Sequence, residues 1–300
     1  MSTMTTLVAS SAIALFTLQN AQAVTLQLVQ TVPLPSQVHT VGRWSGGALL
    51  IVRNEHSAAP VFEAYDRQGA KVQTFTLQIP NAVLVSILSG QFARNYDGSL
   101  AIAGVAYDSQ NHGTNFLALI SPGGGQQTII RTDQYFALVV TIAPDGTTWT
   151  AGSEGSSGAA TVIPGIIRRY AADGKLLGVA LAPSQFGSKG RDAAAQSRFA
   201  VSKDRVDWYS PAEHVIVEFS LDGSELGHYS ETVGTVKGIA VCADNSVWIA
   251  SGQNIHALNR SQGTFQSVQQ FGQGVYLYGC ESDTLISGVG AGALSWLQPH

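Results

Sequence analysis

Tight turns of two kinds alternate along the whole chain, and this alternation constrains the fold more than any other feature of the sequence. Between the turns lie short runs rich in Val, Ile, Thr, Leu and aromatic residues, which are typical of β-strands. Turns of the first kind recur at intervals of roughly 40 to 60 residues, the length of a four-stranded propeller blade with its loops. They are Ser45-Gly46-Gly47, Asp97-Gly98, Asp145-Gly146, Lys203-Asp204, Asp244-Asn245 and Ser282-Asp283. Those of the second kind are Gln68-Gly69, Gly123-Gly124-Gly125, Asp173-Gly174, Asp222-Gly223 and Gln262-Gly263.

One unit shows the repeat most plainly, with expected strands at 236–243, 246–252, 254–260 and 264–271. Five other units follow the same pattern, but the last of the six ends one strand short. The segment 24–32 (VTLQLVQTV) is a strand that belongs to no unit. Because pairing it with the incomplete unit would close a ring and remove exposed sheet edges, we predict an all-β, six-bladed β-propeller whose N-terminal strand completes the last blade. A β-sandwich with coincidental turn spacing is the alternative; a parallel β-helix would have shorter rungs.

The N-terminus has the pattern of a signal peptide. An apolar run of about a dozen residues from Leu7 to Leu18 precedes Ala21-Gln22-Ala23, the small-residue pattern that signal peptidase accepts, although no Lys or Arg stands before the run. The run is shorter than the roughly 20 residues that a membrane span needs. We predict cleavage after Ala23, which leaves a single domain over residues 24–300 and an exported (periplasmic or secreted) protein without stable membrane insertion. A buried N-terminal strand or helix is the alternative.

Composition excludes several classes of protein. Only 12% of the 300 residues are charged, against roughly 25% in most globular domains, but 45% are hydrophobic, which excludes disorder. The net charge of −4 argues against nucleic acid as a partner. Both methionines, Met1 and Met4, lie in the leader, and two cysteines cannot build a Cys-rich zinc or iron–sulfur centre. We therefore predict no particular cofactor. We expect a monomer that binds a small molecule or a protein.

The repeats resemble those of a known superfamily. Residues 238–265 (GIAVCADNSVWIASGQNIHALNRSQGTF) resemble one NHL-type propeller repeat, as found in NHL, gluconolactonase-like and streptogramin-lyase-like proteins. The segments AEHVIVEFSLDGSELG and IIRRYAADGKLLG resemble the second half of such a repeat. The resemblance covers nearly the whole mature chain and implies a six-bladed propeller, but its motifs mark strands and turns rather than chemistry.

Two departures from these families argue against inherited catalysis. Gluconolactonase-like enzymes hold a divalent metal with acidic residues on the inner strands, whereas the expected inner strands here offer only Glu281. Streptogramin-lyase-like repeats tend to place Glu at the end of the Trp-bearing strand, where this sequence has Ala151-Gly152 and Ala250-Ser251. We therefore favour a binding module over an enzyme.

The candidate ligand-binding residues are polar residues of one expected face. In such a ring, the loops between blades and those between second and third strands gather on one loop-rich face, where the resemblance places ligand binding. The candidates are His39, Arg43, His56, Asp108, His112, Tyr135, Arg191, Arg198, Glu213, His214, Lys237 and Tyr276. The alternative function is a metal-assisted lactonase or lyase, in which His56, His112, Glu213 and His214 would hold a divalent cation. Solvated surface histidines would explain the same residues.

Matching positions in different units predict two further features. Cys242 and Cys280 each stand two residues before the turn of adjacent units, so in an exported protein we predict a disulfide between two neighbouring blades; two buried free thiols are the alternative. Trp149, Trp208 and Trp248 recur just after three turns of the first kind. We expect them to pack between blades rather than to form a carbohydrate-stacking surface.

Overall fold

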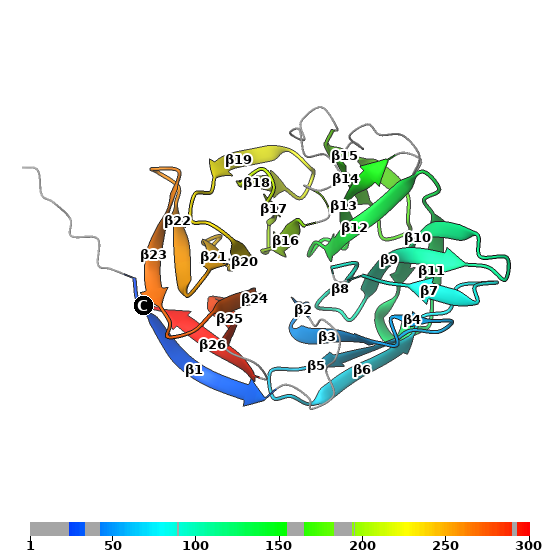
Figure 1. Cartoon of the computed structure of the whole chain (residues 1–300), viewed down its shortest axis with the longest axis horizontal. Helices are drawn as coiled ribbons and strands as arrows, with labels where there is room; N and C mark the ends of the chain where they lie inside the picture. Colours follow the sequence, from blue (N-terminus) through cyan, green and yellow to red (C-terminus); the bar gives the residue numbers. More distant parts are fainter. Residues whose placement is uncertain are drawn as a thin grey trace, which may run out of the picture.

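The computed structural model describes residues 24–33, 43–88, 90–154, 165–182, 194, 196–289 and 293–300. The predicted leader, residues 1–23, lies outside this set. The described strands form six sheets arranged around a central axis, which confirms the predicted six-bladed β-propeller (Figure 1). In the described part of the chain, no helix is long and apolar enough to cross a membrane.

The first three blades each run from an inner strand at the channel to an outer strand at the rim. Blade 1 contains, in that order, β2 (Arg43–Ser45), β3 (Ala48–Arg53), β5 (Val61–Tyr65) and β6 (Lys71–Thr76). Blade 2 contains β8 (Phe92–Arg94), β9 (Leu100–Tyr107), β10 (Gly113–Ile120) and β11 (Gln127–Arg131), with the short 3₁₀ turn η1 (Pro122–Gly124) between the last two. Blade 3 contains β12 (Tyr135–Ile142), β13 (Thr148–Glu154), β14 (Gly165–Tyr170) and β15 (Leu176–Leu181).

The other three blades follow the same plan. Blade 4 contains β16 (Arg198–Val201), β17 (Arg205–Ser210), β18 (Val215–Ser220) and β19 (Glu225–Ser230). Blade 5 contains β20 (Val236–Val241), β21 (Val247–Ser251), β22 (Asn254–Asn259) and β23 (Thr264–Gln270). Blade 6 contains β24 (Val275–Glu281), β25 (Thr284–Val289) and β26 (Ala293–Pro299), and its outermost strand is β1 (Leu26–Pro33).

Pairing of the two ends of the domain closes the ring. Strand β1 runs antiparallel to β26, from Leu26 opposite Pro299 to Pro33 opposite Ala293, and the two strands lie side by side in Figure 1. The backbones of Thr25 and His300 exchange two further hydrogen bonds, of 3.1 and 2.9 Å. The spare N-terminal strand therefore completes the last blade, as predicted. This pairing satisfies backbone groups that an open end would leave exposed.

Blade 2 contains two strands that the sequence pattern does not predict. Strand β7 (Leu84–Ser86) pairs with β9 beyond the end of β8, and β4 (His56–Ser57) pairs with β7. The turn that follows β7 lies against blade 3, because the carbonyl of Gly90 accepts a 2.8 Å hydrogen bond from the amide of Val140. The buried Gln91 side chain donates to the carbonyl of Ala137 over 2.5 Å. The connection between blades 1 and 2 thus binds the inner strand of blade 3.

Turns of the first kind position the tryptophans. The Asp145 carboxylate accepts hydrogen bonds from the Thr147 amide (2.9 Å) and hydroxyl (2.7 Å), while Gly146 adopts φ +83°, which a side chain would disfavour. The Thr147 hydroxyl in turn accepts the Trp149 indole N–H over 3.1 Å, and Ser246 accepts that of Trp248 over 2.8 Å. Trp149, Trp208 and Trp248 are 0, 2 and 4% exposed, so they are core residues, as predicted.

The Thr147 hydroxyl gives the first testable prediction. We expect Thr147→Val to lower the free energy of unfolding by about 1 kcal/mol, because the substitution leaves the buried Trp149 N–H without an acceptor and removes one turn bond. Urea unfolding monitored by tryptophan fluorescence measures the change. Thr74→Val, an exposed position on the outer strand β6, is the matched control and should change stability by less than about 0.5 kcal/mol.

Candidate binding site at the central channel

A cavity of about 430 Å³ lies at the centre of the ring. All six blades line it, through the ends of their inner strands and the turns of the first kind that follow. Its lining residues are 44–46, 94–96, 141, 142, 144, 199–203, 239, 241, 243 and 278–282. The cavity therefore opens on the face that carries these turns. Its volume lies within the roughly 300–1,000 Å³ of pockets that bind small molecules.

Arg94 fixes one side of the mouth of this cavity. Its guanidinium donates to the carbonyl of Gly46 (2.5 Å) and to the side-chain oxygen of Gln73 (2.9 Å), so it joins the turn of blade 1 to blade 2. Ser45 reinforces this contact by donating its hydroxyl to the Arg94 carbonyl over 2.7 Å. Burial lowers the pKa of Arg94, and nearby Asp97 opposes that shift. The guanidinium is thus already committed to holding two blades together.

Glu281 and Tyr96 meet at the same mouth from blades 6 and 2. A Cβ placed on Gly47, which has φ +72°, would lie 3.3 Å from the Tyr96 ring and 3.7 Å from Oε1 of Glu281. Burial raises the pKa of the half-buried Glu281 carboxyl, and the Arg67 charge and the Trp296 indole oppose this shift. Local desolvation of the hydroxyl also raises the pKa of Tyr96, although most of the residue's surface is exposed, and the negative charge of Glu281 adds to that effect. A carboxylate and an aromatic ring are therefore neighbours at the opening.

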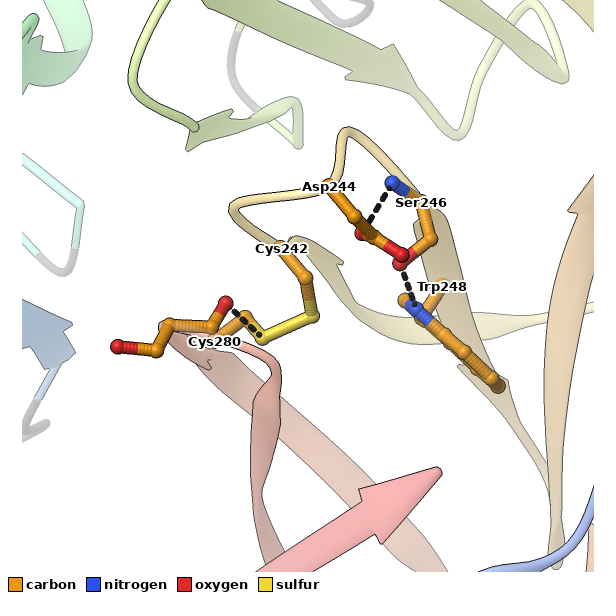
Figure 2. Close-up of a disulfide and its surroundings, with 6 residues drawn as sticks. Cys242, Asp244, Ser246, Trp248 and Cys280 are labelled. Atoms are coloured by element: carbon orange, nitrogen blue, oxygen red, sulfur yellow. Dashed lines mark hydrogen bonds between the residues drawn. A yellow bond between two sulfur atoms is a disulfide. The ribbon is translucent and has the colours of Figure 1, made fainter. Parts of the chain in front are cut away.

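A disulfide between Cys242 and Cys280 adjoins the cavity, with the two Cα atoms 5.1 Å apart (Figure 2). It joins the end of the inner strand of blade 5 to that of blade 6, as the matching positions predicted. Cys280 lines the cavity directly. The amide of Ala243 also donates to the carbonyl of Ser282 over 2.8 Å, so a covalent bond and a hydrogen bond hold these two blades together at the mouth.

The candidate residues from the sequence do not line this cavity. His39 and Arg191 lie outside the described residues, and only the backbone of Arg43 is described, at the start of β2. Tyr135, Arg198, Lys237 and Tyr276 stand at or near the starts of their inner strands, whereas the cavity lies at the opposite ends. The sequence pattern assigns binding to the loop-rich face, but this hollow opens on the other face.

One of the candidates, His214, contacts a buried acid that the sequence does not reveal, and another, Arg198, lies next to the Tyr209 that also contacts this acid. The Glu231 carboxylate is fully buried and accepts hydrogen bonds from His214 Nδ1 (3.2 Å), from the Tyr209 hydroxyl (3.4 Å) and from the backbone amide of Val233. Arg198 lies opposite Tyr209 in the sheet, and burial lowers its pKa. His214 itself adopts φ +54°. Nothing local marks Glu231 as buried, because it simply follows an outer strand.

The remaining candidates form separate local contacts. His112 Nδ1 lies 3.4 Å from Asp108, and the ring of His56 contacts the Ser86 hydroxyl at 3.1 Å. Lys237 lies 5.0 Å from the centre of the Tyr276 ring. The amide of Glu213 donates to Ser210 over 3.3 Å, and the hydroxyl of the buried Tyr135, whose pKa burial raises, lies 2.7 Å from Thr150.

The four residues of the metal-assisted alternative do not form a metal centre. His214 lies with Glu231, whereas His56 and His112 make their own contacts in the first two blades. Over the described ranges, no three side chains of His, Cys, Asp or Glu come together in a way that could hold a metal ion.

Comparison with known proteins establishes the fold class. No family model and no curated protein matches the chain. Among solved structures, the β-propeller domain of Myceliophteria thermophila Cps50 (Swd1) is 10% identical over 91% of this chain and 99% of its own, with a TM-score of 0.52. The Dos1 propeller is 9% identical over 84% of this chain and 65% of its own, with a TM-score of 0.50.

A gluconolactonase-like structure is also similar, at 17% identity over 89% of this chain and 95% of its own, but its TM-score is 0.43. At such identities the Cps50 and Dos1 propellers show a shared fold and nothing of chemistry. The chain is a six-bladed β-propeller with a cavity at one end of its channel.

Proposed function

We propose that this protein is an exported binding module that takes a small ligand at the mouth of its central channel. The observation that supports this function is the cavity of about 430 Å³, which combines an apolar wall with a few polar groups at its rim. Pockets that bind small molecules have this composition, in which apolar area gives affinity and a few polar groups give orientation. The wall includes Ile142, Val201, Ile239 and Val241.

Export belongs to the same proposal. The leader pattern at residues 1–23 favours it, and the Cys242–Cys280 bond is of the kind that persists in oxidising compartments. Membership of the NHL-type superfamily is a further part of the proposal, and it depends on the repeat pattern of residues 238–265 and on the half-repeats at 166–178 and 212–227. The metal-assisted lactonase or lyase has no specific observation in its favour among the described residues.

A fragment experiment tests the proposed function. We expect members of a small-molecule fragment library to bind the mature protein weakly, and to shift the backbone amide resonances of residues 199–203 and 278–282, which line the cavity. Two-dimensional NMR on isotope-labelled protein measures these shifts. Val201→Trp, which places an indole in the half-buried lining of the channel, should reduce the shifts by about tenfold because it fills the space that the ligand occupies.

The controls separate this cavity from the loop-rich face. His112 and His214 report on that face, because they lie in the loops between the second and third strands of blades 2 and 4. Fragments that shift only the resonances of such residues, or that bind the Val201→Trp variant as well as the parent protein, would contradict a site in the channel. A thermal melt of the variant verifies that the ring still folds.

A further inference from the structure

We infer that the ligand of the central cavity carries an organic cation, which binds between the Glu281 carboxylate and the ring of Tyr96. The inference depends on the proposed function, because it concerns the same cavity. It adds the chemical class of the ligand.

Glu281 is the acidic group that lines the cavity. It is half-buried, and its Oε2 atom is shielded from solvent without a hydrogen-bond partner in the part of the chain that is described. Its Oε1 atom lies beside Gly47 at the mouth, and the Tyr96 ring lies beside the same glycine. The Arg67 charge and the Trp296 indole compensate its lost hydration only in part, because burial still raises the pKa of the carboxyl. A cation bound in the cavity beside Oε1 would add a favourable interaction with the carboxylate, and partial burial of the pair would strengthen it.

Two tyrosines are among the residues that line the cavity. Tyr96 is 63% exposed and lines the cavity, so a ligand at the mouth can reach it. Tyr278 is half-buried and lines the same cavity from blade 6. The face of a tyrosine ring attracts an alkylated ammonium group, and recognition of such ligands by aromatic side chains next to a carboxylate follows from the same electrostatics.

The two basic side chains of the lining, Arg94 and Lys203, do not make the cavity a site for an anion. The Arg94 guanidinium already donates to Gly46 and Gln73. Lys203, on blade 4, is the exposed positive charge of the lining, and it follows β16 directly before Asp204. In five of the blades, the turn at the mouth also carries one aspartate: Asp97, Asp145, Asp204, Asp244 or Asp283. Their combined potential attracts cations to the opening.

Calorimetric titration with three probes tests the ligand class. Choline supplies a quaternary ammonium group, 3,3-dimethylbutan-1-ol has the same shape without the charge, and acetate supplies an anion. We expect choline to bind at least about tenfold more tightly than the neutral alcohol, and acetate not to bind. Glu281→Gln should weaken choline binding by about tenfold, whereas Lys203→Gln should strengthen it by about threefold because it removes a repulsive charge.

Matched variants separate the local contact from a general loss of charge or of folding. Asp283→Asn removes the same charge two residues away in the same turn, outside the cavity lining, and should change choline affinity by less than about twofold. Tyr96→Ala removes an exposed ring without opening the core and should weaken choline by about fivefold while the thermal melt stays unchanged. Rescue of affinity in Tyr96→Trp would identify the ring face as the contact.

The outcomes distinguish the ligand class from the function. Absence of choline binding, or equal affinity for choline and the neutral alcohol, would overturn the inferred class. Acetate binding that Lys203→Gln weakens would overturn it in favour of an anion and leave the proposed function standing. Binding of every probe and fragment to the Val201→Trp variant as well as to the parent protein would overturn the proposed function itself.

Discussion

Replacement of Cys242 and Cys280 by Ala in the same molecule should lower the free energy of unfolding by about 4 kcal/mol. The bond connects residues 38 apart in sequence and so closes a loop that contains the whole of blade 5 beyond its inner strand. Such a loop restricts the unfolded chain, and the chain-entropy relation gives about 4 kcal/mol for this length. Guanidinium unfolding of the two proteins, monitored by tryptophan fluorescence, measures the difference.

A reducing agent supplies the control for this experiment. Dithiothreitol should destabilise the parent protein by the same amount and leave the double variant unchanged, because the variant has no bond to lose. The double variant should still close its ring, since the pairing of β1 with β26 does not involve either cysteine. Titration of unfolded, unreduced parent protein that finds two free thiols would contradict the prediction.

The parts of the fold that can be predicted from the sequence are those that depend on local chemistry. A turn such as Asp145-Gly146 has the same hydrogen bonds wherever it occurs, and alternating strands on either side of it fix which residues share a face. The number of such turns therefore predicts the number of blades and reveals the spare strand. Equal distances of Cys242 and Cys280 from their turns predict a disulfide for the same reason.

The site cannot be located in this way, because its position depends on the dimensions of the closed ring. Loops rich in polar residues point to one face, but the hollow arises at the other, where inner strands from six blades end. In the sequence, Glu281 is notable only as the single acid of the expected inner strands, where gluconolactonase-like enzymes have several. No motif marks Tyr96. Strands β4 and β7, of 2 and 3 residues, are too short to leave a periodic pattern.

Buried acids also cannot be predicted from the sequence. The most deeply buried one among the described residues lies between blades 4 and 5. Asp207 stands directly opposite Glu218 in strands β17 and β18, and both are at most 1% exposed. Glu218 is well compensated, because Arg260 of blade 5 and Arg205 pair with it and the Tyr229 hydroxyl donates to it over 3.2 Å. Neither oxygen of Asp207 has a hydrogen-bond partner among the described residues.

Burial raises the pKa of the Asp207 carboxyl well above its ordinary value, and the charge of Glu218 raises it further, while Arg205 and Arg260 oppose the shift. The folded protein therefore binds this proton more tightly than the unfolded chain, in which the pKa is about 3.9. As pH rises above the unfolded pKa, the unfolded chain loses this proton while the folded protein keeps it. The free energy of unfolding therefore falls with rising pH, beginning near the unfolded pKa. Asp207 thus stabilises the fold least at neutral and alkaline pH.

Asp207→Asn removes this dependence, because the amide is uncharged at every pH. We expect the substitution to raise the free energy of unfolding by about 1–3 kcal/mol at pH 8, because the parent protein must there either ionise a buried carboxyl or keep it protonated above its unfolded pKa. At pH 4 we expect a change of less than about 0.5 kcal/mol. Guanidinium unfolding at both pH values measures the two differences. Asp204→Asn, an exposed acid near the same ion pairs, should show no comparable gain at pH 8. Equal effects of Asp207→Asn at the two pH values would mean that the carboxyl is compensated in the folded ring, and would contradict a buried acid that resists ionisation.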